Sequence, residues 1–144
     1  MKILIINGPN LNMLGYRNPE IYGNKTLKDL EDMIKAYCLE HNIECSFIQS
    51  NHEGVLIDAI HDAYFKKYDG VVINPGALGH YSYALRDALE ILTCLKIEVH
   101  ISNIQEREAF RRISVISEVC DKTISGKGLV GYLEAINLLL TLRK

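Results

Sequence analysis

Polar side chains follow the apolar runs of this chain at the points where predicted strands end. They are amides, hydroxyls and imidazoles, and they belong to Asn7, Asn10 and Asn12; to Gln49, Ser50 and Asn51; to Asn74 and His80; and to His100, Ser102 and Asn103. In open parallel α/β sheets, ligands bind beyond the carboxyl ends of the strands. Turn formation would explain any one Asn or Ser. Four polar strand ends together, two of them with a histidine able to act as acid, base or donor, favour a pocket for a polar ligand.

Glu98 interrupts the apolar residues Ile97 and Val99 in what reads as a central strand. A carboxylate in such a position must be paired or hydrogen-bonded. We predict a nearby histidine as its partner, with the carboxylate fixing the tautomer of the ring and keeping it protonated. The alternative is a glutamate near the edge of the sheet.

A loop rich in Gly, Pro and Asn follows the first strand over residues 7–23. This composition predicts neither strand nor regular helix, and loops of such length usually bind or cover ligands. The loop carries Arg17 and Tyr22, a cation and a phenol that can meet over a ligand. We predict an active-site lid at about residues 8–25.

Three arginines follow the fourth predicted strand in the short amphipathic segment 107–112. A solvated charged face accounts for at least one of Arg107, Arg111 and Arg112. Arginine also binds carboxylates bidentately, so that another can reach an anionic ligand. Asp87, on a predicted helix, is a candidate to hold such an arginine in place.

The elements that position these groups alternate between strands and helices. Strands are predicted at 2–6, 43–49, 70–74, 96–100 and 120–125, and helices at 27–38, 55–63, 83–92 and about 128–143. Such alternation predicts a parallel sheet with right-handed crossovers and helices on both faces. Five strands favour a flavodoxin-like, doubly wound α/β fold of order 2-1-3-4-5. We expect a single domain over residues 1–144.

Two helices have informative patterns. Thr26 is predicted to cap the first, with Asp29 as its capping-box partner. The last carries an apolar stripe and a second apolar set that is larger than a solvent-facing helix needs, which agrees with oligomerisation; the stripe is Leu129, Leu133, Ile136 and Leu140, and the second set Val130, Leu138 and Leu139.

Composition narrows the classes of function. The 144 residues are 48% hydrophobic with a net charge of −2, which suffices for a core and disfavours nucleic acid or an anionic membrane as partner. No apolar stretch approaches the roughly 18 residues of a membrane span, and residues 2–6 read as a strand rather than a signal sequence. The four cysteines lack metal-ligand spacing, so we expect free thiols in the cytoplasm and neither disulfide nor metal site.

Residues 126–131 match G-x-G-x-x-G and open a helix after a strand. The dinucleotide fingerprint begins a βαβ unit and has an acidic residue about 20 positions later, whereas only 13 residues follow Gly131 here. We therefore assign the motif to tight strand–helix packing and not to NAD binding.

Taken together, the motifs resemble those of the type II 3-dehydroquinate dehydratases over essentially the whole domain. They are N-G-P-N-L-N at 7–12, L-G-x-R-x-P-x-x-Y-G at 14–23, Q-S-N-x-E-G at 49–54, I-N-P-G-A at 73–77, His80, E-V-H-I-S-N at 98–103, R-E-x-F-R at 107–111 and G-x-G-x-x-G-Y at 126–132. The resemblance implies a cofactor- and metal-free lyase that eliminates water from 3-dehydroquinate through an enolate to give 3-dehydroshikimate, in the shikimate or quinate pathway. It also implies a dodecamer built as a tetramer of trimers.

The resemblance further implies a role for each matching residue. Tyr22 as phenolate is the base, Arg17 lowers its pKa and Asn10 helps to handle the proton, while His100, oriented by Glu98, is the general acid. Substrate contacts fall to Asn74, which together with a water in the family steadies the enolate oxygen, to His80 and Arg111, to the backbone of Ile101 and Ser102, and to Asp87 from a neighbouring subunit.

Two alternatives stand beside this interpretation. The first alternative is a flavin carrier or a receiver domain with the predicted fold. A flavin carrier needs a hydroxyl- and glycine-rich phosphate loop after the first strand and a receiver needs clustered acids there, whereas residues 7–12 supply asparagines and a proline. The second alternative is an inactive member of the family that serves as a scaffold, and a turnover assay distinguishes such a protein from an active enzyme.

Overall fold

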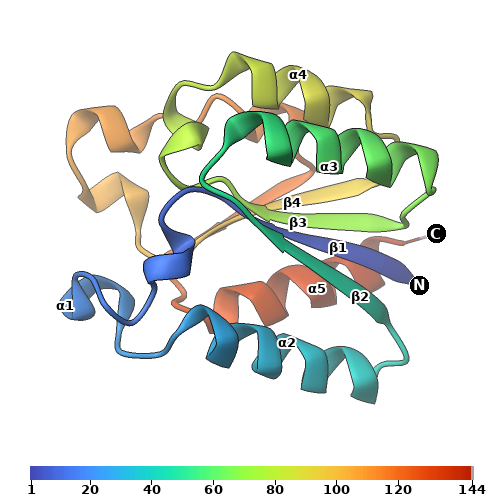
Figure 1. Ribbon diagram of the computed structural model, residues 1–144, viewed down its shortest axis with the longest axis horizontal. Coiled ribbons are helices and arrows are strands. Elements are labelled where there is room, and N and C mark those ends of the chain that lie inside the picture. Colours follow the sequence, from blue (N-terminus) through green and yellow to red (C-terminus); the bar gives the residue numbers. More distant parts are fainter. Residues whose placement is uncertain (144) are drawn as a thin grey trace.

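Five strands form one parallel sheet in the order β2-β1-β3-β4-β5, which is the predicted flavodoxin-like arrangement (Figure 1). The structure is a computed structural model that describes residues 1–143, and of Ile21 and Tyr22 the backbone alone. The strands are β1 (Lys2–Asn7), β2 (Glu44–Gln49), β3 (Gly70–Asn74), β4 (Leu95–His100) and β5 (Lys122–Ser125).

Helices cover both faces of the sheet, with α3 and α4 on one side and α2 and α5 on the other (Figure 1). Their bounds are α1 (Pro19–Tyr22), α2 (Leu27–Glu40), α3 (Glu53–Phe65), α4 (Tyr83–Ile91) and α5 (Val130–Leu142). Short 3-10 turns lie at Leu11–Met13, Gly76–His80, Ile104–Glu106, Ala109–Arg112 and Ser117–Val119. Within the described part of the chain, no helix has the length and apolar character needed to cross a membrane.

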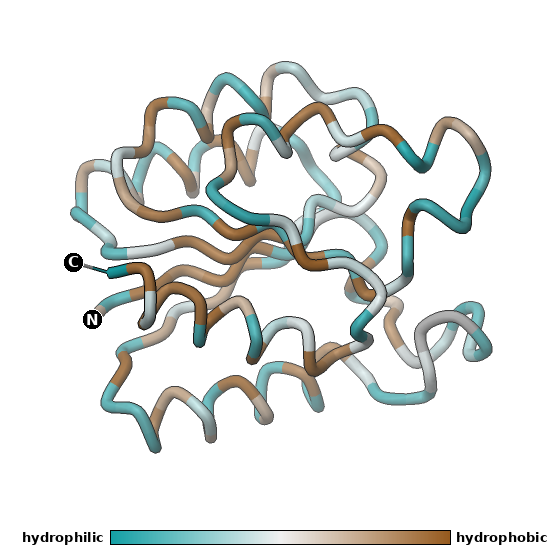
Figure 2. The backbone as a smooth tube through the Cα atoms, turned by 180° about the vertical axis from the view of Figure 1, so that it is seen from behind, coloured by the Kyte–Doolittle hydropathy of each residue, from teal (hydrophilic) through white to brown (hydrophobic). Residues whose placement is uncertain are grey.

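Alternation along the strands divides the core into two halves. Ile3 and Ile5 of β1 pack with the residues of α2 and α5, whereas Leu4 and Ile6 pack with those of α3 and α4. The strands are accordingly the most continuously hydrophobic part of the tube in Figure 2, and the helices alternate between apolar and polar residues. A strand buried on both faces needs such a run, and its end, where polar residues begin, marks the edge of the core.

The start of α2 has the predicted capping box. Thr26 Oγ1 accepts from the Asp29 N–H at 3.2 Å, and the Asp29 carboxylate accepts from the Thr26 N–H at 2.9 Å. Both bonds satisfy N–H groups that have no partner within the helix. The cap fixes where the loop after β1 ends and α2 begins.

The prediction for the last helix was wrong in its orientation. The residues of α5 that face the sheet are Gly131, Tyr132, Ala135, Ile136 and Leu139. Leu139, expected on the outer face, is fully buried, and only Val130 of that outer set is well exposed. The helix α5 packs against both the sheet and α2, so these two neighbours bury a wider part of its circumference than the single apolar stripe that the sequence predicted. The apolar surface left over is smaller than the sequence suggested.

The loop over residues 8–25 contains two short helical turns, Leu11–Met13 and α1, where the sequence predicted no helix. Asn10 begins the first with φ +71° and Asn18 the second with φ +39°. Asparagine tolerates this left-handed region better than most residues, which explains its repeated use here. The loop lies at the carboxyl ends of the strands, and both termini lie at the opposite end of the sheet (Figure 1).

Candidate active site

A pocket of about 140 Å³ opens at the carboxyl ends of β1, β3 and β4. Its walls come from the loop after β1, from the turn after β3 and from the segment after β4. The lining residues are Pro9, Asn10, Leu11, Leu14, Arg17, Asn74, Gly76, Ala77, His80, His100, Ile101, Ser102, Ile104, Arg107 and Arg111. Gln49, at the end of β2, instead donates to the Gly8 carbonyl at 3.2 Å and so supports the loop rather than the pocket.

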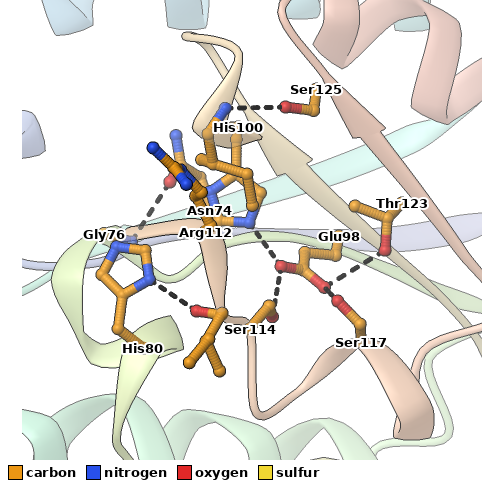
Figure 3. Close-up of polar contacts among 12 residues, drawn as sticks. Asn74, Gly76, His80, Glu98, His100, Arg112, Ser114, Ser117, Thr123 and Ser125 are labelled. Atoms are coloured by element: carbon orange, nitrogen blue, oxygen red, sulfur yellow. Dashed lines mark hydrogen bonds and ion pairs between the residues drawn. The ribbon is translucent and has the colours of Figure 1, made fainter. Parts of the chain in front are cut away.

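His100 and Glu98 form a buried pair on the same face of β4 (Figure 3). His100 Nε2 is hydrogen-bonded to a Glu98 carboxylate oxygen, as the sequence predicted. A carboxylate only accepts, so Nε2 carries the proton of that bond. The other ring nitrogen, Nδ1, remains for the pocket, which His100 lines.

Three hydroxyls complete the surroundings of Glu98. Ser114 and Ser117 each donate to the carboxylate at 2.7 Å, and Thr123 donates at 3.2 Å (Figure 3). Burial raises the pKa of Glu98, but the hydrogen bonds from His100, Ser117 and Ser114 outweigh it and hold the pKa below its ordinary value. The carboxylate therefore remains charged beside the ring of His100.

His80 reaches the pocket from the turn after β3. Its Nδ1 lies 2.7 Å from the Ile113 carbonyl (Figure 3). A carbonyl accepts only, so Nδ1 carries a proton and Nε2 is the nitrogen left for a ligand. The ring of Phe110 meets His80 edge-on, with centroids 6.3 Å apart.

Three guanidinium groups line the same pocket, those of Arg17, Arg107 and Arg111. Arg107 donates to Ser102 Oγ at 3.2 Å, and Arg111 pairs with Glu108 at 2.5 Å. No carboxylate belongs to the lining among the residues that the structure describes. The pocket is thus cationic and suits an anionic ligand.

Backbone N–H groups add to this preference. The carbonyls of His100, Ile101 and Ser102 accept from Gly126 and Gly128, which hold the segment from the side of α5. Within the described chain, the N–H groups of Ile101 and Ser102 donate to no protein acceptor. Adjacent unpaired N–H groups beside arginines form a cradle for a carboxylate.

Most of the predicted site residues come together in this pocket. They are Asn10, Arg17, Asn74, His80, His100, Ile101, Ser102 and Arg111, with Glu98 directly behind His100. Asp87 is exposed on α4 and is not part of the lining, and the arginine near it, Arg86, pairs with Glu118. The side chain of Tyr22 lies outside the described residues.

Sequence reasoning gave no separate role to Arg107, although it recognised the arginine segment that contains it. It also missed Tyr132, whose hydroxyl lies between two strand-end amides, donating to Asn7 Oδ1 at 2.6 Å and accepting from Asn74 Nδ2 at 2.9 Å. Only the position of this tyrosine directly after the glycine motif could have suggested such a contact. Gly131 is buried against the sheet, but a Cβ there would make only an ordinary contact with Ile124 at 3.4 Å, so the contact distances do not require a glycine there as the tight packing predicted from the motif would.

Imidazoles, cationic side chains and free N–H groups at the strand ends of a flavodoxin-like sheet define a class of α/β protein with a pocket suited to a small anionic molecule. A sequence model described as Dehydroquinase class II matches residues 1–140. The chain belongs to this family.

Relatives and solved structures agree with this assignment. The chain is 57% identical to a 3-dehydroquinate dehydratase from Thermotoga petrophila over 94% of its length and 92% of the relative's. It is 54% identical to one from Bacillus pumilus, over 96% and 93%. The crystal structure of a type II dehydroquinase from Butyrivibrio crossotus superposes with a TM-score of 0.96 at 58% identity, covering 97% of each chain. Because the chain belongs to this family, the alternative interpretations as a flavin carrier or a receiver domain are excluded.

Proposed function

We propose that this protein is a type II 3-dehydroquinate dehydratase, a lyase that removes water from 3-dehydroquinate to give 3-dehydroshikimate in the shikimate pathway. The observation that carries the proposal is the His100–Glu98 pair beside a cationic pocket, in a chain of the class II dehydroquinase family. The substrate is a carboxylate with a ketone and several hydroxyls, and the pocket offers guanidinium and N–H donors for the first and amides and imidazoles for the others.

The reaction needs a base, an acid and a donor for the enolate oxygen. In our proposal Tyr22, as phenolate, takes the proton beside the ketone, and the electron pair of that bond forms the enolate. A free tyrosine has a pKa of about 10, so the phenolate requires a nearby cation, and Arg17 at the pocket is that cation. Asn10 helps Tyr22 and Arg17 to handle the proton, and it lines the pocket together with Arg17.

Asn74 donates to the enolate oxygen and thereby stabilises the charge that develops there. As the enolate collapses, the bond to the departing hydroxyl breaks, and His100 transfers a proton to it so that water leaves. Glu98 accepts from Nε2 of His100 and so orients the ring for this transfer. His80, Arg111 and the N–H groups of Ile101 and Ser102 hold the hydroxyls and the carboxylate of the substrate.

We further propose that the protein assembles into a homo-oligomer, the dodecamer that the family resemblance implies. Asp87 supports this proposal because its exposed carboxylate on α4 lies outside its own pocket and is free to complete that of a neighbour. Light scattering of the purified protein measures the mass directly, and an active monomer would refute both the assembly and the role of Asp87.

The test of the function is ultraviolet absorbance after protein is added to 3-dehydroquinate in the presence of a chelator. The product is a conjugated enone carboxylate, so absorbance should rise with the wild-type protein. In Tyr22→Phe the rise should disappear while substrate binding, measured by calorimetry, is largely retained. Near-normal turnover by this variant would remove Tyr22 from the role of base. A folded wild-type protein that binds substrate without turnover would instead be a scaffold.

A further inference from the structure

Asn74 is held from two sides. Its Oδ1 accepts from the N–H of Gly76 at 3.1 Å, and its Nδ2 donates to Tyr132 Oη at 2.9 Å (Figure 3 shows the first contact). A backbone N–H can only donate, so the contact with Gly76 fixes which end of the amide is oxygen. The end near Tyr132 is therefore the NH₂ group, and it needs an acceptor there.

The hydroxyl of Tyr132 can accept from Asn74 only if its own proton points elsewhere. Asn7 Oδ1 lies 2.6 Å away and is the acceptor for that proton. The reverse orientation of Asn7 would leave the Tyr132 proton without an acceptor between two amide NH₂ groups. The chain of donors thus runs in one direction, from Asn74 to Tyr132 to Asn7.

Burial keeps this arrangement intact. Tyr132 is fully buried, Asn7 is 1% exposed and Asn74 is 4% exposed. Burial raises the pKa of Tyr132 well above its ordinary value, so the hydroxyl stays neutral and keeps the single proton that this chain of bonds requires. In the described chain, the Asn7 Nδ2 is the one buried side-chain nitrogen or oxygen without a hydrogen-bond partner. The hydrogen bond that the Asn7 amide makes in this chain of donors is therefore the one that its oxygen accepts from Tyr132.

The glycine motif at 126–131 places Tyr132 at this point. Gly126 and Gly128 adopt φ +76° and +63° and donate to the carbonyls at the end of β4, and Gly131 lies beside Val99 and Ile124 in the first turn of α5. Tyr132 follows directly and reaches beneath the ends of β1 and β3. The glycine motif, which the sequence analysis did not assign to dinucleotide binding, thus positions the side chain of Tyr132.

We propose that Tyr132 is a positioning residue that acts through Asn74. An amide NH₂ has two protons, and the bond to Tyr132 uses one of them. The other is thereby turned to the pocket as a donor, where a developing enolate oxygen requires one. This inference rests on the proposed function, since the role of Asn74 at an enolate belongs to it.

The test is the variant Tyr132→Phe, which keeps the ring in the core and removes only the hydroxyl. Complete loss of an oxyanion donor lowers kcat by about 100- to 1,000-fold, so a donor that has lost one of its two anchors should lower kcat by about tenfold. KM should change less than about twofold, because the donor acts mainly on the transition state. Tyr68→Phe is the matched control, since it removes a phenol that donates to Ser46 at 3.2 Å away from the pocket.

A double-mutant cycle separates positioning from a general structural effect. In an Asn74→Ala background, Tyr132→Phe should cause no further loss of kcat. An equal loss in both backgrounds, or a single variant within twofold of wild type, would overturn the positioning role while leaving the proposed function in place. A wild-type protein that fails to convert 3-dehydroquinate would refute the proposed function and this inference with it.

A second variant guards against misfolding of the first. Asn7→Ala leaves the Tyr132 ring in place and removes only the acceptor of its proton. The hydroxyl can then turn, so kcat should again fall when Asn74 is present and not when it is alanine. An Asn7→Ala protein with wild-type kcat would overturn the inference as clearly as an active Tyr132→Phe protein.

Discussion

Neutralising Glu98 should lower stability and activity together. The variant Glu98→Gln keeps the shape of the side chain but replaces an anion that accepts from His100, Ser114, Ser117 and Thr123. A hydrogen bond to a charged group contributes about 1.5–3 kcal/mol and a neutral one about 0.5–1.5 kcal/mol. Four weakened bonds give a loss of about 4 kcal/mol, and relief from burying a charge offsets part of it. We expect a net decrease of about 2 kcal/mol in the free energy of unfolding.

The same change should lower kcat by about 100-fold, because His100 loses the anion that orients its ring. Urea unfolding measures the first effect and ultraviolet initial rates measure the second.

Glu118→Gln is the matched control for both measurements. Glu118 is exposed and pairs with Arg86 at 3.2 Å on the surface, so its loss should cost less than about 1 kcal/mol and leave kcat unchanged. If Glu98→Gln were as stable and as active as this control, the assignment of Glu98 as the buried support of the acid would be wrong.

Three further predictions concern the frame of the site. Thr26→Ala should lower the free energy of unfolding by about 1 kcal/mol in urea, since it removes one half of the capping box. Gly8→Ala should prevent stable folding, seen as loss of a cooperative thermal transition, because its Cβ would lie 2.2 Å from the Pro75 carbonyl oxygen; Gly54→Ala, with nothing within 4 Å, should fold normally. The lowered pKa of Glu98 gives stability that is complete above the unfolded carboxyl value of about 4.3 and is lost as pH falls through the folded value. Wild type should therefore lose more stability than Glu98→Gln between pH 6 and 3, and equal slopes would contradict this.

The sheet was predictable because its signals are local. Runs of β-branched residues separated by capped helices determine where each strand lies, and β3 was predicted with its observed ends at Gly70 and Asn74. The pairing of Glu98 with His100 was predictable for the same reason, because residues two apart on a strand point to one face.

Features that depend on several layers could not be predicted in this way. The orientation of α5 depends on both the sheet and α2, so the period of its leucines did not reveal that Leu139 is buried. Arg107 resembles its neighbours in sequence, and only the turn at Ile104–Glu106 directs it to the pocket. The link between Asn7 and Tyr132 joins residues 125 positions apart, and no pattern in one sequence reports such a contact.

That distant link has a consequence for how the protein is made. The N-terminal strand β1 is an interior strand of the sheet, and its last residue, Asn7, bonds to Tyr132, which is synthesised 125 residues later. The donors to Glu98 at 114, 117 and 123 also follow β4 in order of synthesis. A nascent chain can therefore assemble several strands of the sheet while Glu98 still lacks its hydroxyl donors and the amides of Asn7 and Asn74 still lack their partner Tyr132. We therefore expect the hydrogen bonds that orient Asn7 and Asn74 to be completed only when α5 docks against the sheet.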